Sequence, residues 1–205
     1  MHREAEIHVQ VCKSLAAGLL GLALHISLVL NQRMMELASY VVALFMAASG
    51  NAELLLNDAY LPKAEELIGT ARKSVTIGMY LMSKGDRISE VERCLAAAVK
   101  RGVAVQVILE QSAERNDDIT QTNRETAATL KLLGVPVFFD RPERRSHLKV
   151  IVVDRRYVLL GSHNLTNSAM EKNNEASVLY DDTSMAVKLE SFIISLKEDT
   201  GQKSR

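Results

Sequence analysis

The sequence predicts an α/β domain, in which helices cover both faces of a sheet, preceded by a hydrophobic helical extension. Three observations support this fold class. From residue 57 onward, short apolar runs alternate with amphipathic runs of helical period. Glycines or polar turns separate many of these runs. The first 50 residues differ, because two nearly continuous apolar runs dominate them. We therefore divide the chain into an extension (residues 1–50) and an α/β domain (residues 51–205).

The extension is predicted to be helical over most of residues 14–48, where the apolar runs 14–30 and 37–48 flank a short polar patch. Neither run has the roughly 20 apolar residues that span a bilayer comfortably. Two interpretations stay open. The segment anchors the protein in a membrane, or it forms a helical appendage that packs on the domain or on a second copy. The expected location is cytoplasmic, with membrane association through residues 14–48 as the alternative.

The first half of the domain is expected to alternate helix and strand. Asp58 is placed to cap a helix that ends between residues 69 and 73. The apolar run 74–82 (SVTIGMYLM) predicts a buried strand. Residues 86–101 have a strong helical period, and Gly102 ends that helix. The run 103–109 (VAVQVIL) predicts a second strand.

The second half continues the alternation. A polar loop is expected at 111–120 and an arginine-rich loop, DRPERRS, at 140–146. Between and after these loops we expect helices at 123–133 and 182–196, and strands at 135–139, 148–153, 157–160 and 175–180. Arg155 and Arg156 mark the turn between two of these strands, and GSHNLTNSA forms a loop or helical turn.

Composition narrows the function. The 205 residues include 25 basic and 25 acidic side chains, so no global positive field draws the chain to nucleic acid, although a local basic cleft is compatible with these numbers. Cys12 and Cys94 form no metal-type pair and no disulfide framework. Tryptophan is absent and aromatic residues are few, which argues against a base-stacking platform.

The stretch from His147 to Glu175 concentrates the chemistry. It opens with HLKVIVVD, which ends at Asp154, continues with GSHN (residues 161–164), and closes with Glu175. Side chains two residues apart point to the same face of a strand, so His147 and Lys149 are expected side by side. An imidazole beside an ammonium suits a phosphate, because one group attacks or protonates while the other neutralises charge.

HLKVIVVD, GSHN and the downstream glutamate resemble the HKD signature of the phospholipase D superfamily. The resemblance covers roughly residues 57–198, and NDAYLPKAEELIGTARKSVTIGMYLMS is similar to the usual opening helix and first strand. It implies a layered α-β-α domain with a mixed sheet. The chain carries one motif, as do the short members of the bacterial endonuclease and mitochondrial-surface subgroups. In those members, two copies dimerise to assemble one active site.

The resemblance implies a mechanism. His147 of one subunit attacks the phosphorus and forms a phosphohistidine, while His147 of the partner subunit protonates the leaving oxygen and then activates water. Lys149 and Asn164 hold the non-bridging oxygens, Ser162 lines the phosphate pocket, and Glu175 orients the catalytic histidine. Asp154 is expected to anchor its strand and turn. No metal ion or other cofactor is needed, because lysine and histidine supply the electrophilic assistance.

Other residues near the motif are open to both a functional and a structural interpretation. Arg144 and Arg145, with Arg141, Arg155 and Arg156, flank the motif; they would follow a nucleic-acid backbone or an anionic lipid surface, or else form ordinary solvated loops. His163 fills the variable position of GSHN, and a purely structural role is favoured for it. Gly161 is expected to permit close packing.

Three functions compete. The favoured one is a metal-independent phosphodiesterase that acts as a homodimer on nucleic acid with broad sequence tolerance. The alternative is a phospholipase D-type hydrolase of phosphodiester lipids, which a hydrophobic extension would hold at a bilayer. The third is a non-catalytic nucleic-acid-binding member of the fold, against which the complete set of motif residues argues.

Overall fold

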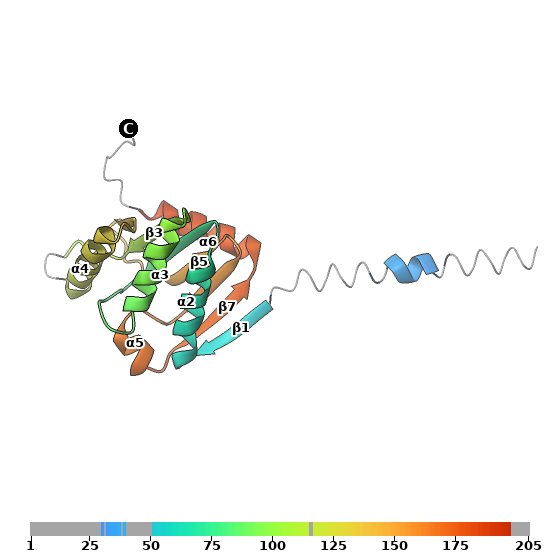
Figure 1. The fold of residues 1–205 in the computed structure, drawn as a ribbon, viewed down its shortest axis with the longest axis horizontal. Coiled ribbons are helices and arrows are strands. Elements are labelled where there is room, and N and C mark those ends of the chain that lie inside the picture. The colour runs from blue at the N-terminus through green and yellow to red at the C-terminus, as the bar shows by residue number, and fades with distance from the viewer. Residues whose placement is uncertain (1–29, 31, 38, 40–50, 115–116, 198–205) are drawn as a thin grey trace, which may run out of the picture. The chain divides into compact units, whose positions relative to one another are not determined.

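Seven strands and six helical segments make up the domain in the computed structural model (Figure 1), which describes residues 30, 32–37, 39, 51–114 and 117–197. The strands are β1 (Asn51–Leu56), β2 (Ser74–Met79), β3 (Ala104–Leu109), β4 (Val137–Phe139), β5 (Lys149–Val153), β6 (Tyr157–Gly161) and β7 (Ala176–Asp181). The helices are the 3-10 turn η1 (Asn57–Ala59), α2 (Tyr60–Thr70), α3 (Ser89–Lys100), α4 (Asp118–Leu132), α5 (Asn167–Glu171) and α6 (Thr183–Ser195).

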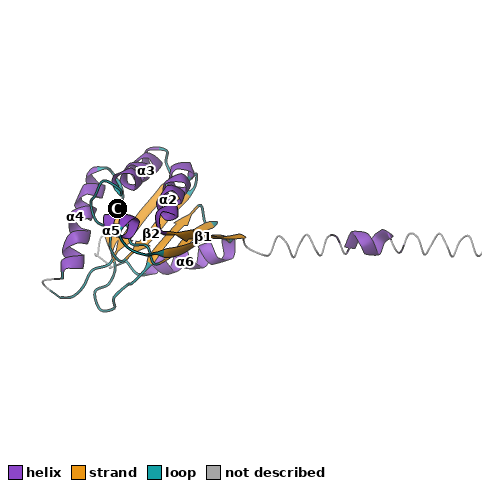
Figure 2. Cartoon of the chain, turned by 90° about the horizontal axis from the view of Figure 1, so that it is seen from below, coloured by secondary structure: helices purple, strands orange, loops and turns teal. Residues whose placement is uncertain are grey.

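All seven strands form one mixed sheet in the order β1-β7-β6-β5-β2-β3-β4. The β2–β3 and β3–β4 pairs are parallel, and the other four pairs are antiparallel. Helix α6 covers one face, while α2 and α3 lie on the opposite face (Figure 2). The expected mixed sheet between layers of helices is confirmed.

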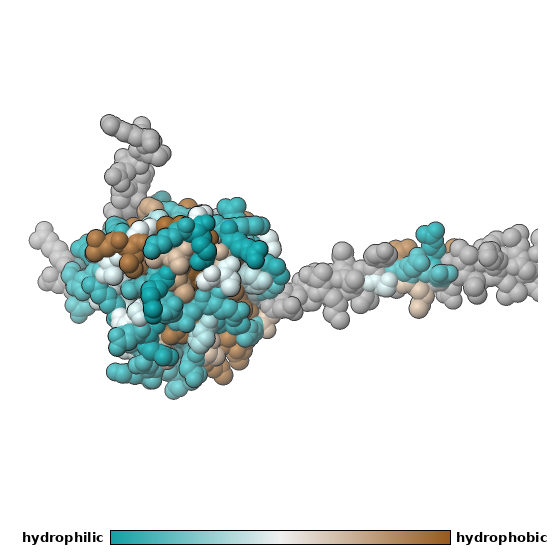
Figure 3. All heavy atoms as spheres, viewed as in Figure 1, coloured by the Kyte–Doolittle hydropathy of each residue, from teal (hydrophilic) through white to brown (hydrophobic). Residues whose placement is uncertain are grey.

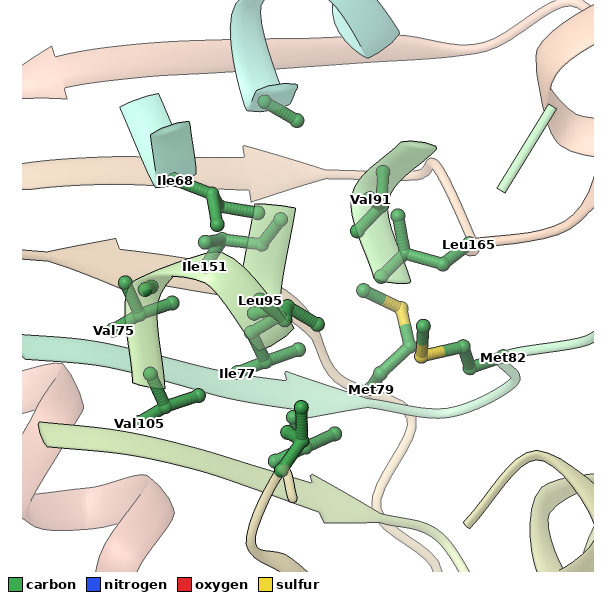
Figure 4. Close-up of a cluster of buried hydrophobic side chains, with 14 of the residues drawn as sticks. Ile68, Val75, Ile77, Met79, Met82, Val91, Leu95, Val105, Ile151 and Leu165 are labelled. Atoms are coloured by element: carbon green, nitrogen blue, oxygen red, sulfur yellow. The ribbon is translucent and has the colours of Figure 1, made fainter. Parts of the chain in front are cut away.

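The core lies mainly between the sheet and the α2–α3 layer. Figure 4 shows Ile68 of α2 and Leu95 of α3 over Ile77 of β2 and Ile151 of β5, all completely buried. Successive residues of β5 alternate between this core and a smaller one under α6, to which Val150 contributes. Strand β5 is therefore buried on both faces, which explains its uninterrupted apolar sequence.

Three elements differ from expectation. Strand β1, which was not expected, pairs antiparallel with β7 at the edge of the sheet. Asp58 does not cap a helix: it lies in η1, and Ala59 precedes α2 without a side-chain cap. Helix α4 begins five residues earlier than the expected residue 123, at Asp118, because the side chain of Asp117 accepts a hydrogen bond from the N–H of Thr120. Such local caps depend on backbone geometry that hydrophobic period does not record.

The visible face of the domain is mostly hydrophilic, and its hydrophobic side chains gather in small separate groups (Figure 3). Of the extension, residues 30, 32–37 and 39 are described and helical; most of the expected anchor at 14–48 lies outside the described residues. Within the described ranges, no helix is both long and apolar enough to cross a bilayer.

Candidate active site

Most of the motif lies where one set of strand ends forms a border of the sheet, which we call the site edge. Strands β2, β3 and β4 end there, and because β5 runs antiparallel to β2, β5 begins there, with Lys149 opposite Met79. The next antiparallel pairings bring the end of β6 and the start of β7 to the same edge, with Gly161 opposite Ser177. Residues spread from 147 to 175 are thus gathered by topology. Asp154 lies beyond the other end of β5.

His147 and Lys149 share the ring of Tyr80, which follows β2. The His147 and Tyr80 rings meet edge-on with centroids 4.4 Å apart, and Lys149 Nζ lies 4.8 Å from the Tyr80 centroid. Lys149 Nζ also donates to the carbonyl of His147 at 3.4 Å. His147 is exposed, whereas Lys149 is 8% exposed. The expected juxtaposition is present, and His147 lies just before β5 rather than within it.

The surroundings of this pair favour a neutral imidazole. Partial desolvation lowers the pKa of His147 below its ordinary value of 6.5, and the positive charges of Lys149 and Arg145 lower it further. Burial likewise lowers the pKa of Lys149, while the nearby charge of Glu175 opposes that shift. A neutral, accessible imidazole beside a cation is the state that a nucleophile toward a phosphate diester requires.

Ser162 and Glu175 form the second part of the site. The hydroxyl of Ser162 donates to the Glu175 carboxylate and accepts the N–H of Ala176 at 3.0 Å. Asn173 Nδ2 donates to Glu175 at 2.9 Å. In the described part of a single chain, Glu175 is not hydrogen-bonded to His147, so its orienting role stays a prediction. Asn164 is half-buried, and its Oδ1 atom is buried without a hydrogen-bond donor among the described groups.

Glu175 is held in its ionised form. Burial raises the pKa of its carboxyl group, but hydrogen bonds from Ser162 and Asn173 and the charges of His163 and Lys149 outweigh burial, so the pKa is lowered. The site edge therefore carries an anion close to the ammonium of Lys149.

A buried histidine, His163, supports the backbone near Glu175. His163 is completely buried and stacks on Tyr60, with ring centroids 4.3 Å apart. Its Nδ1 atom lies 2.7 Å from Ser177 Oγ, and its Nε2 atom lies 3.0 Å from the carbonyl oxygen of Asn57. Asn57 also accepts the N–H of Glu175 through Oδ1 at 2.8 Å. These contacts give His163 a structural position, as favoured from the sequence.

Asp154 has an anchoring position. Its carboxylate accepts hydrogen bonds from the backbone N–H groups of Arg72, Lys73 and Ser74, at distances of 2.7 to 3.1 Å. Burial raises the pKa of Asp154, yet these three donors and the charge of Lys73 outweigh it and leave the pKa lowered. Asp154 and Arg155 both adopt positive φ, at 55°. The carboxylate thus joins the end of β5 to the start of β2.

The flanking arginines separate into two groups. Arg141, Arg144 and Arg145 line a pocket of about 510 Å³ that His147 also lines. Arg155 and Arg156 lie at the opposite edge, where they pair with Glu190 and Asp181 at 2.5 and 2.6 Å. The two turn arginines are therefore not beside the site, contrary to one of the two expectations for them.

Within the pocket, the arginines differ in whether their side chains form ion pairs with acidic residues. Arg145 lies 3.5 Å from both Glu110 and Asp117, so acidic groups offset part of its charge. Arg144 is exposed, and among the described residues no ion pair engages its side chain. Glu143 and Asp140 also line the pocket, as does Phe192 of α6. The pocket thus joins a basic loop to an apolar wall beside His147.

Sequence reasoning missed Tyr80, Asn57 and Glu110. Each follows directly after a strand at the site edge, and that position is the only signal the sequence offers for them. For a metal centre, the described residues contain no group of three or more His, Cys, Asp or Glu side chains that would hold an ion. Metal independence stays a prediction.

Comparisons with known proteins place the fold. A family model described as "Cardiolipin synthase, PLD-like domain" matches residues 65–196. The chain is 29% identical over 119 residues to a protein named Phospholipase D from Rickettsia bellii, covering 58% of this chain and 54% of that one. It is 25% identical over 114 residues to Cardiolipin synthase A from Pectobacterium carotovorum, covering 52% and 24%. The chain therefore spans about half and about a quarter of these two curated relatives.

Solved structures of similar fold agree with the family match. Nuc from Salmonella typhimurium, described as a phospholipase D family member, superposes with a TM-score of 0.60 at 22% identity and covers 72% of this chain and 94% of that one. NucT from Helicobacter pylori gives a TM-score of 0.55 at 23% identity, with 72% and 96% covered. Phosphatidylserine synthase from Haemophilus influenzae gives 0.55 at 18%, with 71% and 38% covered.

These structural likenesses, all at low identity, support the fold alone. The family model, in contrast, matches more than half of the chain. With the motif residues other than Asp154 gathered at one edge of the expected mixed sheet, the conclusion is that this chain belongs to the PLD-like domain family of the phospholipase D superfamily.

Proposed function

We propose that this protein is a metal-independent phosphodiesterase that works as a homodimer and cleaves nucleic acid through a phosphohistidine intermediate. One observation carries the proposal. His147 is exposed at the boundary between Lys149 on one side and an arginine-lined pocket on the other. An exposed nucleophile with cations on both sides suits a phosphate diester that belongs to a longer polyanion.

Each step has a group suited to it. The neutral His147 attacks phosphorus, and the P–O bond to the leaving group breaks as that oxygen takes a proton from His147 of the partner subunit. The partner's His147, now neutral, then removes a proton from water, whose oxygen attacks phosphorus and releases the first imidazole. Lys149 balances charge on the non-bridging oxygens, and the amide of Asn164 is placed beside them.

The proposed mechanism requires a dimer because it uses two motif histidines and the sequence contains one, His147. The other histidines of the sequence are His2, His8 and His25 in the extension and the buried His163. We propose that the second imidazole for acid–base catalysis comes from a second copy. Two facing imidazoles around one phosphate titrate as a coupled pair, so that one is protonated while the other is neutral.

Nucleic acid is preferred to lipid for two reasons. The pocket beside His147 has three arginines in its lining. In addition, the domain matches nearly the whole length of Nuc and NucT but only 38% of phosphatidylserine synthase, which agrees with the resemblance of its motif to the bacterial endonuclease subgroup. The lipid alternative is kept because Phe192 and Leu196 give the same pocket an apolar wall, and because the family description and two relatives' names refer to lipid enzymes.

The deciding experiment supplies plasmid, single-stranded DNA and RNA in EDTA, in parallel with vesicles of phosphatidylcholine and phosphatidylglycerol. The nuclease proposal expects nicking that persists in EDTA and disappears in His147→Ala and Lys149→Ala. Lys100→Ala is the matched lysine control, since Lys100 is exposed at the far end of α3, and it should cleave as the unchanged protein does. Release of choline or glycerol without nicking refutes the preference for nucleic acid.

Dimerisation is tested separately. Light scattering at the concentrations used in the assay should give twice the mass of one chain. A protein that is strictly monomeric while active contradicts the shared site. Mixing His147→Ala with Lys149→Ala subunits should not restore full activity, because the one site that a mixed dimer forms still lacks one imidazole and one ammonium group.

A further inference from the structure

Two buried carboxyl groups lie beneath the arginine-rich loop, outside the motif. Glu110 follows β3 and Asp140 follows β4, and each is 1% exposed. Asp140 Oδ1 accepts the N–H of Gln111 at 2.8 Å. The backbone carbonyl of Glu110 accepts from the side chain of Asn123 at 2.9 Å. Both acids are therefore fixed to the ends of neighbouring strands rather than to mobile loops.

Glu110 reaches the segment that carries the nucleophile. Its Oε2 atom accepts the backbone N–H of Ser146, the residue before His147, at 2.5 Å. Its Oε1 atom lies 3.5 Å from Nε of Arg145. One buried side chain thus holds the two residues that immediately precede the proposed nucleophile.

The two acids are neighbours across the sheet, because Glu110 and Asp140 follow the paired residues Leu109 of β3 and Phe139 of β4, and the N–H of Asp140 donates to the carbonyl of Leu109 at 3.0 Å. Glu110 Oε1 and Asp140 Oδ2 are buried, and neither has a hydrogen-bond donor among the described groups. Two facing carboxylates only accept, so a proton on one of them is needed to join the pair, and burial disfavours two adjacent negative charges. Burial raises the pKa of Glu110 to about 7; Asp140 adds to the rise, while Ser146 and Arg145 oppose it.

We propose that Glu110 is a positioning residue for His147, which it holds through the N–H of Ser146 while sharing one proton with Asp140. The catalytic part of this inference rests on the proposed function, because it concerns the nucleophile of that reaction. The positional part does not, since it concerns hydrogen bonds within the folded protein.

Whether Glu110 holds the loop before His147 is expected to depend on the proton that it shares with Asp140. When the pair is singly protonated, Glu110 and Asp140 attract each other and the loop is tied to β3. When the proton leaves, the two carboxylates repel, and Arg145 is the cation placed to compensate. Arg145 is already shared with Asp117, which lies 3.5 Å away. The loop, and His147 with it, is therefore expected to loosen as the pair ionises.

Nuclear magnetic resonance of the full-length protein tests the positional part without any substrate. The amide proton of Ser146 should shift with a midpoint near pH 7 in the unchanged protein, because its acceptor ionises there. Glu110→Gln should abolish that step, since an amide accepts from Ser146 and donates to Asp140 at every pH. Glu190→Gln is the matched control: Glu190 is also buried, at 3% exposed, but pairs with Arg155 at the far edge. It should leave the step intact.

A step near pH 7 that persists in Glu110→Gln, or that is absent from the unchanged protein, overturns the proposal. If the protein cleaves none of the substrates offered, the proposed function fails, while the amide titration still decides the positional part.

Activity supplies the second readout. At pH 6, Glu110→Ala should lower kcat by about ten- to a hundredfold with KM nearly unchanged, as expected when a catalytic group is displaced by about 1 Å. Glu110→Gln should keep kcat within about twofold at pH 6 and should lose less of it between pH 6 and pH 8 than the unchanged protein loses. Equal losses over that pH range in both proteins contradict the role of the shared proton.

Discussion

Replacing Asp154 by alanine tests whether this motif residue anchors the fold or takes part in catalysis. The change removes the acceptor for three backbone N–H groups, of which those of Arg72 and Lys73 lie in exposed residues and gain water in return. We count about 1 kcal/mol for each lost hydrogen bond. Alanine at a φ of 55° costs about 1 kcal/mol more. The free energy of unfolding should therefore fall by about 4 kcal/mol.

Asp154→Asn separates the two contributions, because asparagine tolerates positive φ and keeps one side-chain oxygen as an acceptor. We expect a loss of about 1–2 kcal/mol from the missing charge. Urea unfolding at pH 7, followed by circular dichroism, measures both values. The pKa of Asp154 is lowered by folding, so its stabilisation is present above the ordinary value of 3.8. That stabilisation is lost as pH falls through the folded-state pKa, and the difference between variants should shrink there.

Activity completes the test of Asp154. Seven residue steps of about 3.3 Å along the strand place its Cα about 23 Å from that of His147. Folded Asp154→Asn should therefore keep its turnover within about twofold. An unchanged urea midpoint in Asp154→Ala refutes the anchoring argument, and a hundredfold loss of turnover in folded Asp154→Asn would assign the carboxylate to catalysis.

Three further outcomes follow from the site. Gly161→Ala should lower unfolding free energy by about 1–3 kcal/mol, because its Cβ would meet the Ser177 backbone; an unchanged urea midpoint would contradict this close approach. His163→Phe keeps an aromatic ring on Tyr60 but loses two hydrogen bonds, so the free energy of unfolding should fall by about 2 kcal/mol. An unchanged free energy of unfolding would refute this role of His163. Since the pKa of His147 is lowered, the acid limb of kcat/KM should lie below pH 6.5; a limb above 6.5 would refute a neutral nucleophile.

Local spacing was sufficient for part of the site. His147 and Lys149 are two residues apart, so an extended backbone places their side chains on the same face. Their shared contact with the ring of Tyr80 depends on the antiparallel pairing of β5 with β2, which the sequence did not show. The apolar run of β5 likewise indicated a strand, whereas its burial on both faces is a finding of the structure. Strand β1 was missed because its only partner in the sheet is β7, which lies near the other end of the domain sequence.

The arginines that flank the motif in the sequence lie far apart in space because of the sheet topology. Arg145 and Arg155 precede and follow the same strand, and a strand carries its two ends to opposite edges of the sheet. Only the group before β5 lines the pocket with His147. Nearness in sequence was therefore a poor guide for basic residues beyond the turn.

The sequence by itself determined the motif, the order of most strands and helices, and the pairing of an imidazole with an ammonium, because these depend on period and on spacing within one strand. Only the tertiary structure decided that Glu110 accepts a hydrogen bond from Ser146, which lies 36 positions further along the chain and directly before the proposed nucleophile. A single glutamate at the end of a strand has no distinctive pattern. Its role arises when parallel β3 and β4 bring it beside Asp140 and exclude water from both.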